Sequence, residues 1–371
     1  MYLNTRMEKP IVADRDIQCF LYIRKYNHVE EEKKHGLNWL FHRVVHKCDP
    51  TGIVYTKYYE PFRSIEMKPG TTIAGKAERI YSGKYNGINH YRVEDGFVNG
   101  MLREDDYGVA VPYKATIPQG TEFYVNNGLF RIAARKMVIS KEKVTVMPSL
   151  QETLHPILPL LVEELFGYDD KIRPGFYYLN NGTYLNPYRL TVDSVGDVCG
   201  IVADINGDMV TVMSLDEKDM IWCKLDCPTR ICSDEDVDSS GDDIMLKVMR
   251  SEHYGDAFLP VRWCSKYETV GGLRGSWHMG SVREVVAAIR ENMLEINLAI
   301  ALLNDSYETL TQKPGRYVMI DSLAHYWTGV DCEDNYAYSV DGCDGSLISC
   351  RKTSSEQKVR AFMTKIKPFT L

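Results

Sequence analysis

The sequence lacks the segments that mark export or membrane insertion. No stretch of about 18 consecutive apolar residues occurs, the length that a transmembrane helix needs, so we expect no membrane insertion. The most apolar stretch, residues 154–166, is interrupted by Pro156 and Pro159. The N-terminus has no apolar segment followed by a small-residue cleavage site, so we expect no signal peptide. We expect the protein to be made and folded in a cytoplasm.

The short motifs of common enzymes are also absent. There is no GxSxG, no Walker phosphate loop and no GxGxxG after a strand. Ten cysteines are present without a CxxC pair, and without a secretion signal we expect them to be reduced thiols. Because no nucleophile–base pair or clear ligand set is found, we expect no enzyme activity, no cofactor and no metal.

An excess of positive charge is missing as well. Lys and Arg number 44 against 51 Asp and Glu, a net charge of −7 at pH 7. This balance disfavours sequence-independent nucleic-acid binding and attraction to anionic membranes, both of which need clustered cations. The 24 tyrosines stand out instead. Tyrosine is enriched at recognition surfaces and also fits strands, and the strand interpretation is the simpler one.

The 371 residues correspond to two or three domains at roughly 100–200 residues each. Turn signals and composition divide the chain into an extended N-terminal arm over 1–30, a β-rich domain over 31–148, a proline-containing helical connector over 149–173, and a further domain over 174–371. The predicted fold class is α+β, a mainly β domain followed by a mixed one. Asn-Gly pairs at 127–128, 181–182 and 206–207 each predict a hairpin turn.

One helix start has a clear signature. Ser281 and Glu284 form a capping-box pattern, in which each side chain bonds the main-chain N–H of the other residue. Apolar residues then recur every three or four positions from Val282 to Leu303. We expect one long helix or two short ones broken near Asn292. After Pro314-Gly315 we expect short strands at 316–320, 336–340, 346–350 and 358–366.

An acidic and aromatic cluster follows the helix. Five acids lie within fourteen residues, interleaved with two tyrosines: Asp331, Glu333, Asp334, Asp341 and Asp344, with Tyr336 and Tyr338. A calcium or sugar site and a simple polar loop surface are both compatible with this pattern, and the polar surface is favoured.

Residues 277–285, WHMGSVREV, resemble the Trp-x-Leu-Pro-Ser-x-x-Glu-Leu signature of a C-type-lectin-like domain family. That family occurs in surface proteins of Bacteroidetes and in variable receptor-binding proteins of phages. Further landmarks follow in the family's order, among them Tyr326-Trp327 and the strand at 358–362, so the resemblance covers about 174–371. Gly280, Thr328-Gly329 and Tyr338 depart from the usual residues, and the calcium–sugar motifs of animal lectins are absent.

The resemblance implies a rigid scaffold with an outer segment that binds a ligand. Its structural signature is Trp277, Ser281, Glu284, Tyr326, Trp327 and Arg360, with both tryptophans expected in the core. The implied ligand-binding face lies between Val330 and Gln357, an irregular stretch in such folds. Its candidate residues are Asp331, Asp334, Asn335, Tyr336, Tyr338, Asp344 and Arg351.

The N-terminal half more faintly resembles a small β-rich domain of phage proteins, through residues 113–124 and 134–139. Surface proteins of the lectin-like family need a signal and a lipidated cysteine, whereas a virion protein needs neither. The first hypothesis is therefore a structural or adhesive virion protein of a tailed phage of gut Bacteroidetes, of fibre or decoration type, assembled in the host cytoplasm. In it the β-rich domain over 31–148 would be the attachment domain that joins the particle, and the lectin-like domain would face the host. Its partners would be other virion proteins, further copies of itself (by analogy a trimer) and a host surface glycan or protein.

Two other classes remain open. One is a bacterial, non-virion ligand-binding protein. The other is an enzyme on a fold like that of formylglycine-generating enzymes, which would need a reactive cysteine pair. Cys343 and Cys350 are the only candidates for such a pair.

Overall fold

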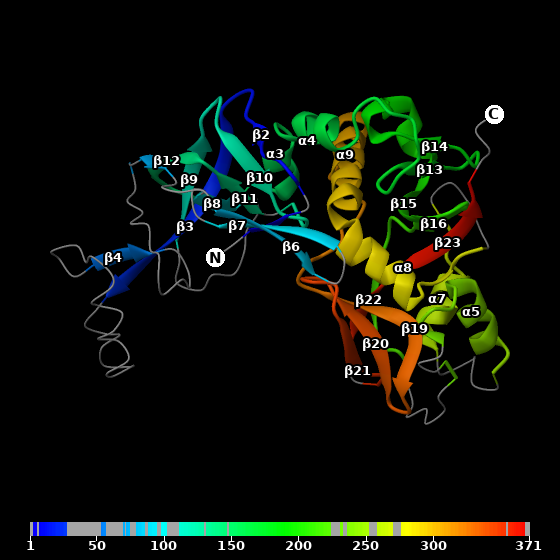
Figure 1. Ribbon diagram of the computed structural model, residues 1–371. Coiled ribbons are helices and arrows are strands. Elements are labelled where there is room, and N and C mark those ends of the chain that lie inside the picture. The colour runs from blue at the N-terminus through cyan, green and yellow to red at the C-terminus, as the bar shows by residue number, and fades with distance from the viewer. Residues whose placement is uncertain are drawn as a thin grey trace. The chain divides into compact units, whose positions relative to one another are not determined.

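The chain forms two compact units, Met1–Leu160 and Leu161–Leu371. The computed structural model (Figure 1) describes residues 3–5, 7–27, 53–56, 70, 72–74, 79–85, 88–94, 98–101, 111–129, 131–146, 148–223, 231–232, 236–251, 258–269, 276–353 and 355–367. Antiparallel sheets dominate the first unit, and the second combines sheets with helices. The predicted α+β class is therefore confirmed.

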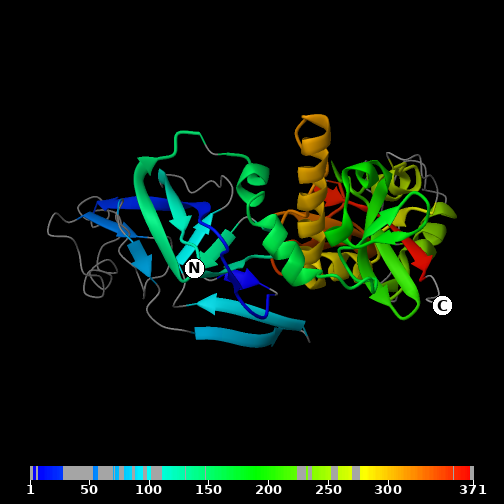
Figure 2. The same ribbon diagram turned by 90° about the horizontal axis from the view of Figure 1, so that it is seen from above.

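The described residues of unit 1 form two sheets. The larger one has the strand order β2 (Ile11–Val12), β10 (Glu122–Val125), β11 (Arg131–Ala134), β8 (Val98–Met101), β3 (Ile17–Asn27), β9 (Val111–Ile117), β12 (Lys136–Lys143) and β5 (Thr72–Ala74), with β4 (Ile53–Thr56) paired to β3. The smaller one, a separate layer in Figure 2, has the order β1 (Leu3–Thr5), β7 (Ile88–Glu94) and β6 (Arg79–Tyr85).

The expected N-terminal arm supplies strands to these sheets. β3 pairs with β9 from Ile17 to Ile23, and Ile17, Cys19 and Leu21 are almost fully buried. Because these side chains belong to the core of unit 1, residues 3–27 are part of that unit rather than an arm. The end of the expected arm, 28–30, and several parts of the expected attachment domain, including 31–52, 57–69 and 102–110, lie outside the described residues.

The expected connector contains two short helices, α3 (Leu150–Leu154) and α4 (Leu158–Leu165). Ser149 and Glu152 cap α3 with a capping box, in which Ser149 N donates to Glu152 Oε2 at 2.6 Å. The division between the two units falls inside α4.

Two of the three predicted Asn-Gly turns form as expected. Gly182 has φ +83° between β13 (Tyr177–Leu179) and β14 (Tyr184–Leu185), and Gly207 has φ +60° between β15 (Val198–Asn206) and β16 (Met209–Met213). Both pairs of strands are antiparallel. The left-handed backbone that such turns need is supplied by glycine, as the sequence predicted.

The third hairpin, between β10 and β11, forms with a different turn. The positive φ, +56°, lies at Leu129 and not at Asn127 or Gly128. Leu129 N donates to Asn126 O at 2.9 Å, and Arg131 N donates to Asn126 Oδ1 at 2.8 Å, so the loop is longer than two residues. The Leu129 side chain is fully buried, and this burial offsets the strain of a left-handed leucine.

In unit 2, the part of the chain that the structure describes forms two sheets and several helices (Figure 1). The first sheet has the order β14, β13, β15, β16, β23 (Ala361–Ile366) and β18 (His278–Met279). The second has the order β17 (Lys218–Met220), β22 (Gln357–Val359), β19 (His325–Glu333), β20 (Tyr336–Asp341) and β21 (Leu347–Arg351). The helices are α5 (Gly241–Met249), α7 (Leu259–Ser265), α8 (Val282–Val286) and α9 (Met293–Thr311).

Of the two alternatives left open by the sequence, one long helix or two broken near Asn292, the structure shows the broken form. α8 passes into a π-helical turn, Ala287–Glu291, and α9 begins after Asn292. The Asn292 side chain donates to Ala203 O on β15 at 2.9 Å. A side chain that bonds a neighbouring strand instead of its own helix explains why the helix is interrupted here.

Both signature tryptophans are buried, as the sequence predicted. Trp277 packs edge-on against Tyr267 with ring centroids 5.1 Å apart, and Trp327 donates from Nε1 to Met220 O at 2.9 Å. A Cβ on Gly280 would lie 2.7 Å from the ring of Phe362. The close packing of this ring explains why glycine stands where the resembled family usually has proline.

The expected strand at 316–320 does not form. Two asparagines of α9 hold this segment instead. Asn304 Nδ2 donates to Tyr317 O at 2.9 Å and Asn304 Oδ1 accepts from Tyr317 N at 3.0 Å, while Asn297 makes the same pair of bonds with Ile320. Because both side chains are buried, they replace the hydrogen bonds that a neighbouring strand would supply. The strands expected at 336–340 and 346–350 form as β20 and β21.

Among the described residues, no helix has the length and apolar character needed to cross a bilayer.

Candidate functional site

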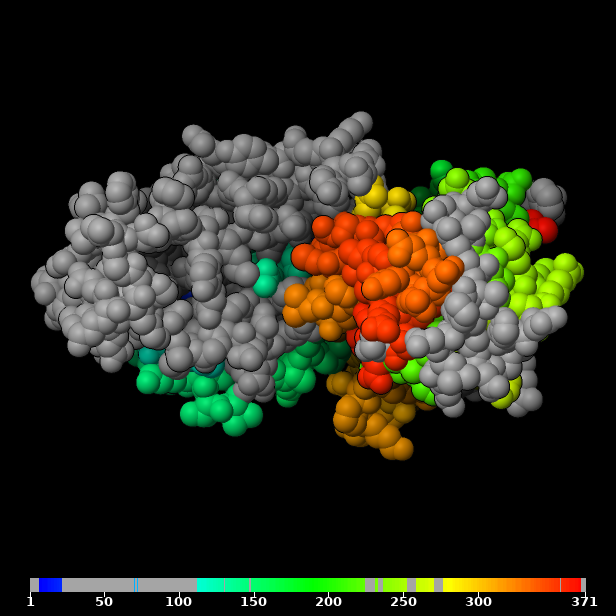
Figure 3. Space-filling view, turned by 90° about the horizontal axis from the view of Figure 1, so that it is seen from below, coloured from blue at the N-terminus to red at the C-terminus, as the bar shows by residue number. Residues whose placement is uncertain are grey.

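The stretch expected to carry the binding face is a regular antiparallel sheet, not an irregular loop. β20 pairs with β21, placing Tyr336 opposite Arg351 and Tyr338 opposite Ser349. Tyr336 and Arg351 are exposed and Tyr338 is half-buried, whereas the intervening Ala337 is buried. Alternation along the strand therefore directs these side chains to the outer side of the sheet. Figure 3 shows β19 to β21, coloured orange to red, as one continuous surface.

The turn between β19 and β20 completes this surface. Asp334 and Asn335 are exposed, and with Glu333 and Tyr336 they line a shallow, open hollow. We call Asp334, Asn335, Tyr336, Tyr338 and Arg351 the β19–β21 face.

Asp331 does not belong to this face, and its prediction as a ligand contact is wrong. It is 1% exposed. Its Oδ2 accepts from the N–H groups of Ile231 and Cys232 at 3.0 and 3.1 Å, and its Oδ1 lies 2.6 Å from Lys352 Nζ. Since Lys352 is also 1% exposed, the two residues form a buried ion pair beneath the face.

This ion pair fixes the turn. Lys352 Nζ donates to Asp334 O at 2.9 Å, and Lys352 N donates to Asn335 O at 3.0 Å. One buried lysine thus holds two consecutive residues of the face through its side chain and its main chain. A fixed turn loses little conformational entropy when a ligand binds. Lys352 was not singled out from the sequence, because an isolated lysine has no local pattern that predicts its burial.

Asp344 is exposed but lies at the other end of β20, in the turn between β20 and β21. Its Oδ1 accepts from Ser346 N at 2.8 Å, so its side chain shapes its own turn. The structure therefore does not bring Asp344 together with Asp334 and Asn335.

A second cluster surrounds the predicted helix start, whose capping box is confirmed. Ser281 N donates to Glu284 Oε2 at 2.8 Å, and Glu284 N donates to Ser281 Oγ at 3.3 Å. His278 lies between two acids, with Nε2 2.9 Å from Glu284 Oε1 and Nδ1 3.0 Å from Asp242 Oδ1. His278 is fully buried, and Asp242 is half-exposed at the start of α5. The cluster ties α5 to α8.

The two acids change the titration of the histidine. Burial alone would lower the pKa of His278, but its hydrogen bonds with Asp242 and Glu284 outweigh burial and raise it to about 9. The hydrogen bond with His278 lowers the pKa of Asp242. Burial would raise the pKa of Glu284, yet His278 and Ser281 lower it overall. The structure therefore favours a charged histidine between two carboxylates.

A prediction follows for Gly241, whose Cα adjoins this cluster. A Cβ there would lie 2.1 Å from His278 Cδ2 and 2.6 Å from Glu284 Oε2. Gly241→Ala is therefore expected to lower the free energy of unfolding by about 1–3 kcal/mol, as overpacked sites do. Urea unfolding of the natural chain and of the variant measures this loss of free energy. Gly196→Ala is the control, because a Cβ there meets nothing within 4 Å, and an equal loss in both variants would contradict the prediction.

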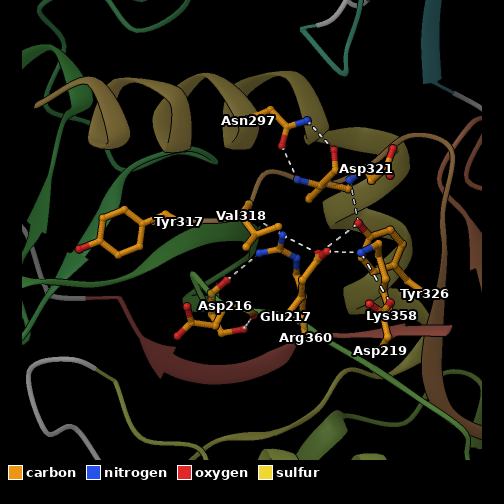
Figure 4. A network of polar contacts seen from close by, with 12 residues as sticks. Asp216, Glu217, Asp219, Asn297, Tyr317, Val318, Asp321, Tyr326, Lys358 and Arg360 are labelled. Carbon is orange, nitrogen blue, oxygen red and sulfur yellow. Dashed lines mark hydrogen bonds and ion pairs between the residues drawn. The ribbon is translucent and has the colours of Figure 1, made fainter. Parts of the chain in front are cut away.

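Arg360 lies at the centre of a third polar network (Figure 4). Its Nη2 donates to Glu217 Oε2 at 2.8 Å and to Val318 O at 2.6 Å. Lys358 Nζ lies 2.5 Å from Glu217 Oε1, and Tyr326 donates to Glu217 Oε2 at 3.3 Å. Arg360 is 3% exposed. Tyr326 and Arg360 thus join β19 and the β22–β23 bend through one carboxylate, which is a structural role.

The cysteine pair that an enzyme would need is not brought together. The β20–β21 ladder places Cys350 opposite Ala337, while Cys343 lies in the turn beyond Asp341, at the other end of β20. Within the described part of the chain, no group of three or more His, Cys, Asp or Glu side chains is arranged to hold a metal ion.

Comparison with known proteins yields one distant likeness. No family model matches the sequence, and no curated protein matches it. A fimbrial protein from Bacteroides ovatus ATCC 8483 is similar in structure, with 12% sequence identity and a TM-score of 0.37. The match covers 80% of this chain and 66% of the fimbrial protein, so this chain spans just under two thirds of that protein.

Proposed function

We propose that this chain is a ligand-binding protein of the adhesive type, without catalysis, and that the β19–β21 face contacts a surface glycan or protein. The observation that carries the proposal is the buried Asp331–Lys352 pair, which holds the turn at Asp334 and Asn335. Burying an ion pair costs desolvation energy that its attraction barely offsets. Here the pair fixes the main chain of a turn that adjoins Tyr336 and Arg351 in the sequence, and tyrosine and arginine are enriched at binding hot spots.

The chemistry of the face supports binding rather than turnover. Tyr336 and Arg351 are cross-strand neighbours, and tyrosine and arginine are the residues enriched at binding hot spots. Asp334 and Asn335 add hydrogen-bonding groups beside the shallow hollow. An open hollow suits a branched glycan or a protein surface better than a small substrate, which needs enclosure.

The test is binding of the full chain to immobilised glycans and to whole bacterial cells. The double variant Tyr336→Ala/Arg351→Ala is expected to bind at least about tenfold more weakly, since truncating hot-spot residues costs 1 kcal/mol or more each. Leu310→Ala/Arg283→Ala is the matched control, because both side chains are about half-exposed on the α8–α9 helices. Equal binding by the two double variants would contradict the proposal.

The same role fits two settings. A bacterial ligand-binding protein needs only this chain and its ligand, so we place it first. The virion setting, with the N-terminal unit attached to a phage particle and the chain assembled as a homo-oligomer, requires further partner proteins. Immunodetection of the chain in purified bacterial surface fractions and in purified phage particles distinguishes the two settings.

A further inference from the structure

Two tyrosines stand together on unit 2, next to the six-stranded sheet and away from the sheet that carries the β19–β21 face. Tyr168 follows α4, and Tyr188 lies in the turn η1 (Pro187–Arg189) after β14. Their ring centroids are 4.4 Å apart with planes at 64°, and the Tyr188 hydroxyl donates to the Tyr168 hydroxyl at 2.6 Å. Tyr168 is 66% exposed.

One buried side chain fixes both tyrosines. Asn186 is 2% exposed. Its Nδ2 donates to the carbonyl oxygens of Gly167 and Asp169 at 3.2 and 2.7 Å, and its Oδ1 accepts from Tyr188 N at 2.9 Å. The main chain on both sides of Tyr168 is therefore joined to the main chain of Tyr188. An exposed ring on so constrained a backbone loses little entropy when it binds.

A pair of charged residues adjoins the two tyrosines along the chain. Arg189 follows Tyr188, and its Nη2 lies 2.7 Å from Oδ2 of Asp170, which comes two residues after Tyr168. The two side chains are 53% and 61% exposed, and an ion pair this exposed contributes little to stability. It can offer a planar donor and a carboxylate acceptor to a ligand that extends beyond the rings. We call Tyr168, Tyr188, Asp170 and Arg189 the tyrosine platform.

We propose that the tyrosine platform binds a saccharide, with one pyranose ring stacked on Tyr168. The C–H face of a pyranose is attracted to the negative face of an aromatic ring. Neighbouring sugar hydroxyls accept hydrogen bonds from a guanidinium and donate them to a carboxylate, and these are stronger than neutral hydrogen bonds. The Tyr188 hydroxyl donates to Tyr168, which leaves the Tyr168 hydroxyl proton for a sugar oxygen.

The surroundings favour a sugar over a protein partner. The exposed neighbours Glu163, Asp169 and Lys171 are all charged. A protein hot spot is surrounded by contacts that exclude water from a broader area. The platform instead combines one exposed aromatic ring with exposed charged side chains that can bond sugar hydroxyls.

The test is saturation-transfer difference NMR on the full chain. The probes are methyl pyranosides and short oligosaccharides of hexoses, N-acetylhexosamines and uronic acids, each titrated to saturation. Tyr168→Ala is expected to weaken binding of the bound probe about tenfold, and Tyr168→Phe, which keeps the ring, about threefold or less. Asp170→Ala or Arg189→Ala is expected to weaken binding by about tenfold through a lost charge-assisted hydrogen bond.

Every outcome decides the proposal. If no probe binds, or if the bound probe is held equally well by Tyr168→Ala, the proposal is overturned. If Tyr168→Ala weakens binding to cells whose glycans have been removed enzymatically, the platform contacts a protein and the proposal is overturned as well. Leu310→Ala, whose half-exposed side chain belongs to neither surface, is expected to leave saccharide binding unchanged. A probe whose binding is weakened by Tyr336→Ala and not by Tyr168→Ala is bound at the β19–β21 face, so failure of this proposal is separable from failure of that face.

Discussion

Lys352→Met is expected to lower the free energy of unfolding of unit 2 by about 3–5 kcal/mol, because it leaves a buried carboxylate without its cation. Asp331 is 1% exposed and its Oδ1 lies 2.6 Å from Lys352 Nζ. The two N–H groups of Ile231 and Cys232 would remain on Oδ2, but they carry no net charge. Urea unfolding at neutral pH measures the loss through the fluorescence of the tryptophans buried in unit 2.

The double variant Asp331→Leu/Lys352→Met separates stability from the arrangement of the face. Replacing both members of a buried ion pair with apolar residues is often neutral or stabilising, but the N–H groups of Ile231 and Cys232 lose their acceptor, so only part of the lost stability is expected to return. Ligand binding is not expected to return with it, because the bond from Lys352 Nζ to Asp334 O is still missing. A double variant that folds and binds like the natural chain would show that the ion pair does not prepare the face.

Local patterns were predictable from the sequence. The capping box of Ser281 and Glu284 depends on residues three positions apart, and the turns at Gly182 and Gly207 on adjacent residues. The helical periodicity from Val282 to Leu303 was likewise visible from neighbours along the chain, whereas the choice between one helix and two depended on the contact of Asn292 with the distant Ala203. Such local features form from interactions within a few residues, so a short stretch of sequence contains all the information that they need.

Contacts between distant residues were not predictable in the same way. Asp331 was expected on the surface because it belongs to an acidic stretch, and nothing near it indicates a partner twenty-one positions later at Lys352. Asn297 and Asn304 replace a strand at 317–320 from seven positions apart on α9. In these cases a polar residue, which is ordinarily expected at the surface, is buried and hydrogen-bonded instead. Whether a residue is buried is decided by tertiary packing, which a local stretch of sequence does not show.

The ring pair Tyr168–Tyr188 illustrates the same limit for binding residues. Each tyrosine on its own suits a strand, and only the fold brings the two rings to 4.4 Å. The one available signal was the density of Asn, Pro and Gly around Tyr188, which indicates an ordered turn and not a strand. Residue type therefore predicts which chemistry a surface can offer better than it predicts where in the fold that surface lies.

The stability of unit 2 is expected to fall as the pH rises through about 9, and His278→Gln is expected to remove that fall. The pKa of His278 is raised to about 9 by Asp242 and Glu284, against about 6.5 in an unfolded chain. The stabilisation that protonated His278 provides is therefore fully present below pH 6.5, and it is lost as the pH rises through the pKa of His278 in the folded chain. The difference corresponds to roughly 3 kcal/mol.

The acids act in the opposite direction. The pKa values of Asp242 and Glu284 are lowered in the fold, so their stabilisation is present above their unfolded values near 4 and is lost as the pH falls further. Stability from this cluster is therefore highest between about pH 5 and 6.5. Lys365 faces the cluster from β23 and further favours the ionised form of Asp242.

Urea unfolding at several pH values from 6 to 10 tests this directly, because the difference between the natural chain and a variant cancels groups that titrate elsewhere. In the natural chain the native state binds one proton more than the unfolded state between the two pKa values, so stability falls by up to about 1.4 kcal/mol per pH unit. The variant His278→Gln has no titrating group at this position, so this fall in stability is expected to be absent from it. His325→Gln is the control, since His325 is 40% exposed and lies 3.6 Å from Asp341. An alkaline loss that persists in His278→Gln and disappears in His325→Gln would mean that the buried imidazole is not the group that titrates.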